Sequence, residues 1–268
     1  LITSGDPLPA KESAVVIANH QQMTDITWLM DLAKQKGRLG DLKWFVKDKI
    51  KWVPGVGWGM VFLDCLFVKR DWATDAASIE ATFKSFLEDD IPLWLMLFPE
   101  GTRITGDKLA KSKAFAERSG RPATEHVLLP RTSGFCASVE GLRSHVDALY
   151  DVTIGYEGGV PNLWQFVKGV NQVAHIHVRR IPISELPEDK EALAEWLYEA
   201  FRLKDRRLEA FYRDGRFTES PLSDDSDSDQ REAEAQPVAP SVPEQLSADT
   251  TPANDTAGEP LAEVIALN

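Results

Sequence analysis

Cysteine, long apolar runs and nucleophile motifs are scarce or missing in this chain of 268 residues. Its two cysteines, Cys65 and Cys136, are too few for a disulfide framework and indicate a reducing compartment. No run of about 18 uncharged apolar residues occurs, so the sequence as given predicts no transmembrane helix. The nucleophile motif G-x-S-x-G is also missing, which argues against a serine hydrolase.

Metal-ligand spacing and an obvious start to the chain are missing as well. His126, His145, His175 and His177 show no ligand spacing with Cys, Asp or Glu, so we expect no metal. No bound cofactor is expected either. The chain begins at Leu1 without an initiator methionine or a signal peptide, and this start leaves a fragment and a complete protein both open.

Acidic residues are concentrated at the C-terminal end. Residues 218–268 hold twelve Asp or Glu and one base, Arg231, whereas residues 1–217 hold 30 acids and 29 bases, out of a net charge of −12. This acidic tail is almost free of aromatics and cannot bury enough apolar area to offset chain entropy, so it is predicted to be disordered. Its run 223–229 is interpreted as solvated chain, with a phosphorylation site as the alternative. No nucleic-acid partner is expected.

Apolar segments alternate along residues 1–217 in a pattern that predicts an α/β fold, layered αβα around a central mixed sheet. The run Ala14–Ala18 is typical of a buried strand. A helix is predicted from Thr24 or Asp25 to about Lys36, with Ile26, Leu29, Met30 and Ala33 on its buried face. Further strands are predicted at 42–46, 66–68, 93–98, 127–129, 150–156 and 176–183, and further helices at 75–88, 108–119, 133–142 and 190–212.

A basic, tryptophan-rich stretch covers residues 37–72, with seven Lys or Arg and four Trp. Such a composition suits contact with an anionic membrane surface. An ordinary strand and helix with buried tryptophans is the alternative, and the residues themselves leave both open.

The segment Asn19–Asp25 follows the first predicted strand and contains His20 and Asp25. A lone His beside an apolar strand is more often structural. On an ideal helix, residues five apart point about 140° away from each other, so His20 must lie in the turn before the helix. From there its ring can fold back over Asp25 in the first helical turn, where the helix dipole favours a carboxylate. This geometry predicts a general base with an orienting carboxylate.

The segment Phe98–Arg103 follows a second buried strand, so its polar residues are expected beside His20. Arg103 can bind phosphate with its planar fork, and Thr102 and the amide of Gly101 can add donors. Glu100 can bind a polar head group or hold Arg103 in place. The alternative is a capped β-turn with a structural ion pair.

These motifs together resemble the glycerolipid, or lysophospholipid, acyltransferase family, over about residues 14–217. The segments Val53–Gly59 and Leu66–Trp72 are similar to the family's segment that ends in a basic substrate-binding residue. The segments Ala110–Ala116 and Val127–Phe135 are similar to its eukaryotic branch of lysocardiolipin, lysophosphatidylinositol and 1-acylglycerol-3-phosphate acyltransferases. The resemblance implies acyl transfer from acyl-CoA, as cosubstrate, to the free hydroxyl of lysophosphatidate or a related anionic lysophospholipid, with His20 and Asp25 in catalysis.

The resemblance also implies further residue roles. Lys69 and Arg70, after the strand at 66–68, are expected to help bind the glycerol phosphate, although exposed bases at a strand end are common. Pro130 is expected to shape the acyl-chain site. The family pattern places Trp directly after the catalytic Asp, whereas Ile26 and Thr27 precede Trp28 here, which bears on head-group specificity.

The resemblance further implies the organisation and location of the protein. A catalytic domain is expected over 1–160 and a C-terminal extension packing on it over 161–217, before the tail. The membrane surface is an expected partner, at the cytosolic face of the endoplasmic reticulum or a lipid droplet, with any spanning segments outside this chain.

Two rival functions are compatible with the residues. A hydrolase could use the same His to activate water, but the missing serine nucleophile argues against it. A non-catalytic, membrane-associated lipid-binding protein would have a decayed site, and the intact His20, Asp25, Glu100 and Arg103 argue against that reading.

Overall fold

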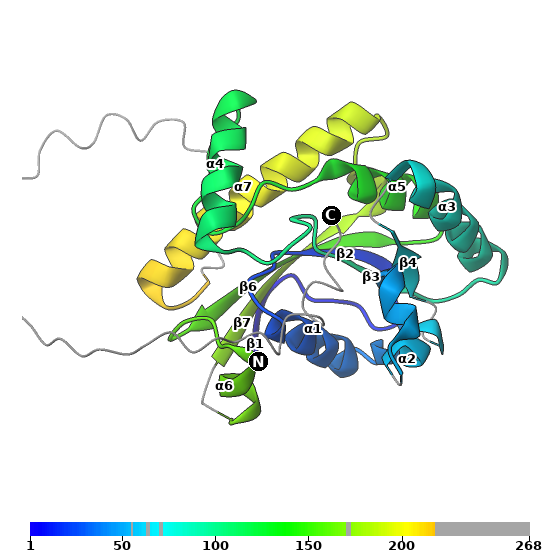
Figure 1. Cartoon of the computed structure of the whole chain (residues 1–268), viewed down its shortest axis with the longest axis horizontal. Coiled ribbons are helices and arrows are strands. Elements are labelled where there is room, and N and C mark those ends of the chain that lie inside the picture. The colour runs from blue at the N-terminus through cyan, green and yellow to red at the C-terminus, as the bar shows by residue number, and fades with distance from the viewer. Residues whose placement is uncertain (55, 63–64, 70–71, 170–172, 218–268) are drawn as a thin grey trace, which may run out of the picture.

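A seven-stranded mixed sheet forms the centre of the protein, as Figure 1 shows. The computed structural model describes residues 1–54, 56–62, 65–69, 72–169 and 173–217, so the acidic tail lies outside the described residues. The strands are β1 (Ile2–Gly5), β2 (Ala14–Ala18), β3 (Leu42–Lys47), β4 (Leu66–Val68), β5 (Trp94–Leu97), β6 (Ala148–Glu157) and β7 (Val173–Pro182). Their order is β1-β7-β6-β2-β5-β3-β4, and only the pair β6–β7 is antiparallel. The predicted α/β fold is confirmed.

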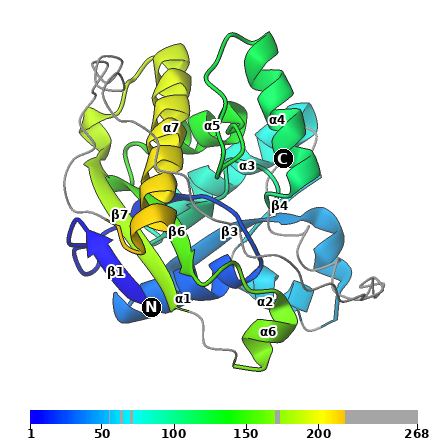
Figure 2. The same cartoon turned by 90° about the vertical axis from the view of Figure 1, so that its left-hand side faces the viewer.

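Helices cover both faces of the sheet (Figures 1 and 2). One side carries α1 (Thr24–Gln35), α2 (Val56–Phe62) and α6 (Leu163–Val167). The other side carries α3 (Trp72–Glu88), α4 (Gly106–Arg118), α5 (Thr132–Leu142) and α7 (Lys190–Asp214). Short 3₁₀ helices are η1 (Leu39–Asp41), η2 (Asp48–Trp52) and η3 (Ile183–Glu185). No helix in the described part of the chain is long and apolar enough to cross a bilayer.

Strand β2 shows why its sequence is continuously apolar. Val16 and Ala18 pack into the core on the α1 side, whereas Val15 and Ile17 pack into the core below α3, α5 and α7. Successive side chains of a strand point to opposite faces, and a parallel strand covered by helices on both faces must be apolar at every position. The alternation also decides on which side the residues after the strand lie.

The strand predicted at 127–129 is wrong. These residues run in irregular chain, and their backbone donors bind side chains instead of a neighbouring strand. The amide of Leu128 donates to Glu100 Oε2 at 2.8 Å, and the amide of Leu129 donates to Ser112 Oγ at 2.9 Å. Val127 is apolar because it fills the core beneath α3, α5 and α7. In the sequence, an apolar run of three residues that fills a core looks the same as a short buried strand.

One strand, two α-helices and one helix face were not predicted correctly. β1 is an exposed edge strand with mixed residues, and α6 has only five residues. α2 contains Gly57 and Gly59, which weaken a helical pattern. On α1, Met30 is 42% exposed, and Leu32 is buried in its place.

Candidate active site

The predicted pairing of His20 with Asp25 is present in the structure. His20 follows β2 by two residues, and Asp25 lies in the first turn of α1. The ring folds back over that turn, so that Nδ1 of His20 and Oδ2 of Asp25 are 2.9 Å apart. The start of α1 also favours a carboxylate at this position through the helix dipole.

Four hydrogen bonds fix the carboxylate of Asp25. Besides His20, the amides of Gln21 and Gln22 donate to Oδ2 at 2.6 and 2.8 Å, and the hydroxyl of Tyr156 donates to Oδ1 at 2.5 Å. Burial and then the charge of Asp25 raise the pKa of Tyr156 well above its usual range, so its hydroxyl remains a donor. Because an ionised carboxylate only accepts, it holds the ring proton on Nδ1 and leaves the lone pair of Nε2 for a substrate.

The loop between β2 and α1 is tied to strand β6. Asn19 Nδ2 donates to the carbonyl of Ile154 at 3.0 Å, and the amide of Ile154 donates to Asn19 Oδ1 at 2.8 Å. Gln21 Nε2 donates to the same carbonyl at 2.6 Å, and Gln21 Oε1 accepts from the hydroxyl of Tyr212 on α7 at 2.9 Å. The His20–Asp25 pair is therefore held by β6 and α7 as well as by its own loop.

The ring of His20 lies deeper than the sequence predicts. We expected it at a strand end outside the core, whereas its side chain is fully buried. The alternation of β2 carries residue 20 to the α1 side, where the ring stacks on Phe98 with centroids 4.1 Å apart. The ring centroids of Phe98 and Trp44 are in turn 6.1 Å apart. Nε2 is buried and, among the described residues, has no hydrogen-bond partner. Such an acceptor gains a full hydrogen bond when a hydroxyl reaches it.

The carboxyl group of Glu100 connects the first motif, Asn19–Asp25, with the second motif, Phe98–Arg103. Oε1 accepts from the amide of His20 at 2.6 Å, and Oε2 accepts from the amide of Leu128 at 2.8 Å. Burial raises the pKa of Glu100 to about 8, while the two amide bonds favour the ionised form. We expected Glu100 to bind a head group or to hold Arg103. In the structure its oxygens instead brace the loop of His20 against the segment at residues 127–129.

The turn after Phe98 lies directly beside the first motif. Gly101 has a φ of +71°, which favours glycine, and its amide donates to the carbonyl of Phe98 at 2.9 Å. That amide closes the turn, so it is not the phosphate donor that we expected. Arg103 Nη1 donates to Gln22 Oε1 at 2.6 Å, and the amide of Ile104 donates to the carbonyl of His20 at 2.9 Å.

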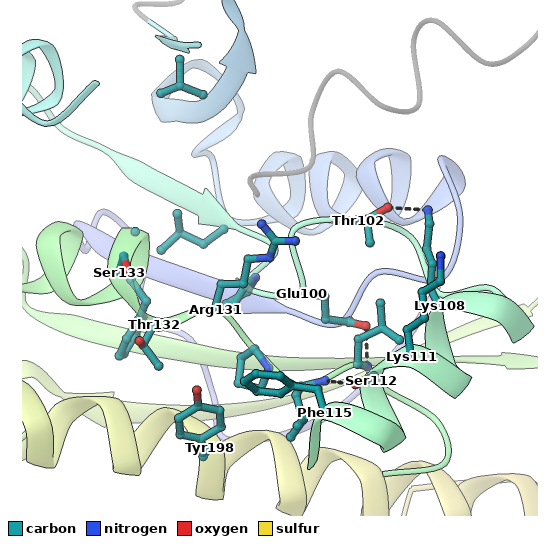
Figure 3. Close-up of a pocket in the computed structure, with 18 of the residues that line it drawn as sticks. Glu100, Thr102, Lys108, Lys111, Ser112, Phe115, Arg131, Thr132, Ser133 and Tyr198 are labelled. Carbon is teal, nitrogen blue, oxygen red and sulfur yellow. Dashed lines mark hydrogen bonds between the residues drawn. The ribbon is translucent and has the colours of Figure 1, made fainter. Parts of the chain in front are cut away.

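A cavity of about 720 Å³ lies on the α4 and α5 side of the same sheet edge (Figure 3). Glu100 reaches it from the second motif. Its lining combines apolar, aromatic and hydroxyl side chains, among them Pro130, Phe115 and Thr102, with three cations. The cations are Lys108, Lys111 and Arg131. Lys108 Nζ donates to the hydroxyl of Thr102 at 2.6 Å. His20 and Asp25 do not line the cavity, because their side chains lie on the α1 side.

The remaining predicted residues are less closely connected. Pro130 lines the cavity, and its role in shaping an acyl-chain site stays a prediction. Lys69 follows β4 with an exposed side chain that does not line the cavity, and its amide donates to Asp75 Oδ1 at 2.8 Å. Arg70 lies outside the described residues. Within the described ranges, no group of three or more His, Cys, Asp or Glu is arranged to hold a metal.

Sequence reasoning missed Tyr156 and the cations of the cavity. Tyr156 shares a face of β6 with Val152 and Ile154, on the α1 side, and lies four residues beyond Val152, the partner of Ala18. Strand alternation places it on that face, but only the pairing of β6 with β2 brings it to Asp25. Lys108 and Lys111 have the three-residue spacing of one helix face, which marks a basic stripe without showing what it faces.

Comparison with protein families decides the class of protein. The family model described as Acyltransferase matches residues 2–157, and the model described as Acyltransferase C-terminus matches residues 165–237. The chain belongs to the acyltransferase family. The predicted resemblance is confirmed at the level of the family, and the division of the chain at residue 160 remains a prediction.

Curated relatives of this acyltransferase chain come from plants and animals. It is 38% identical to "Probable 1-acyl-sn-glycerol-3-phosphate acyltransferase 5" of Arabidopsis thaliana, over 81% of this chain and 58% of that protein. It is 34% identical to "1-acyl-sn-glycerol-3-phosphate acyltransferase epsilon" of Mus musculus, over 79% and 61%, and 34% identical to "Lysocardiolipin acyltransferase 1" of Gallus gallus, over 81% and 58%. The chain thus spans little more than half the length of these relatives.

One solved structure is also similar to the chain. It is the 1-acyl-sn-glycerophosphate acyltransferase PlsC from Thermotoga maritima, with a TM-score of 0.45 and 15% sequence identity. The match covers 78% of this chain and 73% of that chain.

Proposed function

We propose that this chain carries the catalytic region of an acyl-CoA-dependent lysophospholipid acyltransferase, with lysophosphatidate as the acceptor. The observation that carries the proposal is the buried His20–Asp25 pair, whose Nε2 is left as an acceptor beside the turn that holds Arg103. Family membership and relatives whose names specify 1-acyl-sn-glycerol-3-phosphate support it. A lysocardiolipin or lysophosphatidylinositol acceptor is the alternative within the same chemistry, which the name of the Gallus gallus relative supports for lysocardiolipin.

The proposed reaction is a direct transfer without an acyl-enzyme. His20 Nε2 takes the proton of the lysolipid hydroxyl as its oxygen attacks the thioester carbonyl. The carbon–sulfur bond breaks, the thiolate of CoA leaves, and the protonated imidazole returns the proton to it. Asp25 stabilises the imidazolium and holds the ring in the required orientation. Tyr156 and the two loop amides keep Asp25 in place throughout.

The two substrates are proposed to approach from different sides of the second motif. Arg103 lies beside the loop of His20, where a guanidinium fork can hold the acceptor's phosphate within reach of the base. The cavity on the other side suits the acyl donor, because it joins an apolar lining with Lys108, Lys111 and Arg131. These cations complement the phosphates of CoA.

An acyl-transfer assay with the full chain tests this proposal. Acyl-CoA is offered with a panel of lysophosphatidate, lysophosphatidylinositol and lysocardiolipin, and both free CoA and the acylated lipid are measured. We expect CoA release to depend on the lysolipid, to equal the lipid formed, and to be fastest with lysophosphatidate. His20→Gln serves as the inactive control.

Each alternative predicts a different result in that assay. Equal CoA release with and without lysolipid would identify a hydrolase. Preference for another head group would keep the acyl transfer and correct the acceptor. No CoA release with any acceptor, from folded protein, would favour a lipid-binding protein and overturn the proposal.

A further inference from the structure

Four aromatic side chains stand out from the surface of the protein. Trp52 on η2 is 80% exposed, Trp58 and Phe62 on α2 are 68% and 84% exposed, and Trp164 on α6 is 63% exposed. Folded proteins bury most of the surface of such side chains, and an exposed group of them marks a surface that contacts something else. We call these four residues the aromatic edge.

The topology brings the aromatic edge to the end of the sheet that holds His20. β2 runs parallel to β6 and β5, and β5 runs parallel to β3, so the carboxyl ends of these strands share one edge. η2 and α2 follow β3, α6 follows β6, and His20 follows β2. In Figures 1 and 2, α2 and α6 lie on the same side of the sheet as α1, whose first turn holds Asp25.

Both aromatic segments are fixed to the fold. A Cβ on Gly57 would lie 2.3 Å from the carbonyl of Ile50, so α2 packs directly on the backbone of η2. On α6, Asn162 and Gln165 form a capping box, and Phe166 contacts Trp28 of α1 edge to face at 5.8 Å. The four exposed aromatic side chains are therefore carried by segments that pack on the rest of the fold, namely η2 with α2, and α6.

The charge of the neighbouring residues indicates what the aromatic edge meets. Lys49 and Lys51 are exposed on η2, and Lys168 is exposed directly after α6. Lys43, which the composition placed in the same basic surface, is buried and does not belong to it. Tryptophan prefers the interface between lipid chains and water, and lysines beside it favour anionic lipids.

We propose that the aromatic edge docks on an anionic bilayer, with its side chains inserted at the level of the head groups. This proposal rests on the proposed function, because it positions His20 over the membrane in which the acceptor lysolipid lies. The cavity, on the far side of the sheet, is then turned toward the water from which acyl-CoA arrives.

Vesicle sedimentation of the full chain tests the docking. We use vesicles of phosphatidylcholine with and without phosphatidate, and the variants Trp52→Ser/Trp58→Ser/Phe62→Ser and Trp164→Ser. Wild type is expected to sediment with the anionic vesicles, and each aromatic removed is expected to weaken partitioning roughly tenfold. The pair Lys49→Gln/Lys51→Gln is expected to lose roughly fivefold per lysine, on anionic vesicles alone.

Matched controls come from the opposite side of the sheet. Phe115 on α4 is 49% exposed and Leu87 on α3 is 37% exposed, so Phe115→Ser and Leu87→Ser remove comparable apolar surface. Both variants are expected to sediment like wild type. Equal binding by the aromatic variants and wild type would overturn the proposal. So would a dimer of the wild type in solution that the aromatic changes dissociate, because the edge would then be an interface between two copies.

A second measurement separates the docking from the acyl transfer. For each variant we compare the acyl-transfer rate on lysolipid embedded in vesicles with the rate on dispersed lysolipid. The ratio is expected to fall with the aromatic variants and not with Leu87→Ser. Vesicle binding without any acyl transfer would remove the proposed function and leave the docking, whereas transfer with an unchanged ratio would remove the docking alone.

Discussion

Two buried polar clusters share strand β6 and use their groups differently. On the α1 side, the dyad cluster consists of His20, Asp25 and Tyr156. On the α7 side, the ion cluster consists of Asp151, Lys204 and Arg179. Asp25, Asp151 and Lys204 are fully buried, so each cluster must satisfy charges without water.

In the ion cluster, a cation contacts each of the two carboxylate oxygens of Asp151. Lys204 contacts Oδ1 and also donates to the carbonyl of Val152 at 2.6 Å, while Arg179 Nη2 lies 2.9 Å from Oδ2. Burial alone would raise the pKa of Asp151, but Lys204 and Arg179 outweigh it and hold this pKa below its usual range. Burial lowers the pKa of Lys204 to about 8, and Asp151 opposes that shift.

The two clusters differ in whether a buried polar atom is left without a hydrogen-bond partner. In the ion cluster both oxygens of Asp151 and the ammonium of Lys204 face partners inside the fold, so its effect is to join α7 to the sheet. In the dyad cluster every oxygen of Asp25 is occupied as well, yet His20 Nε2 has no partner among the described residues. A rigidly held acceptor that the fold does not use is suited to chemistry.

The largest expected effect is on His20. His20→Gln removes the general base while a polar side chain of similar size remains over Phe98, so acyl transfer should fall about 100- to 10,000-fold. The melting temperature should change little by comparison. Steady-state rates and thermal unfolding check both parts, and more than a tenth of wild-type activity in a folded protein would contradict the assignment.

Breaking the ion cluster should give the opposite pattern. Asp151→Asn leaves Lys204 buried without its anion, which should cost about 3–5 kcal/mol of unfolding free energy. Activity per folded molecule should persist. Glu199→Gln is the control on the same helix, because it breaks the exposed pair with Arg202 and should cost less than about 1 kcal/mol. Urea unfolding measures both, and equal costs would mean that the buried pair does not hold α7.

Tyr156→Phe should weaken the dyad cluster without removing it. Loss of one charge-assisted bond to Asp25 should lower kcat about tenfold and leave KM nearly unchanged. Steady-state kinetics on the folded protein measure both constants.

Tyr150→Phe is the matched control for that change. It removes a buried hydroxyl from the same strand, where the partner is Glu12 instead of Asp25. It should alter stability and leave kcat nearly unchanged. The same fall in kcat in both variants would show that Tyr156 acts only through the strand.

Arg103→Lys should have the smallest effect. The charge is kept but the planar fork is lost, so KM for the lysolipid should rise up to about tenfold. The KM for acyl-CoA should change less. Arg131→Lys, on the cavity side, should reverse that order, and a defect of Arg103→Lys confined to acyl-CoA would remove Arg103 from the acceptor site.

The sequence predicts much of the fold because its strongest signals are local. Ala14–Ala18 and the helix after it follow from an apolar run and a helical pattern, and the His20–Asp25 pair follows from a spacing of five residues. The signal fails at 127–129, where an apolar segment binds Glu100 and Ser112 instead of a strand. It also fails for the tryptophans, since Trp44 is buried whereas Trp52 is exposed.

The sequence by itself determined the dyad and the turn that follows Phe98, because each depends on residues a few positions apart. The class of protein followed from these short motifs and their order along the chain. Only the tertiary structure decided that Tyr156 binds Asp25, 131 residues away, and that Glu100 braces His20, 80 residues away. Sheet order places β6 and β5 on either side of β2, and no local pattern encodes that order. The same packing buried His20 Nε2 and left the aromatic edge exposed, since burial depends on which elements meet rather than on residue type.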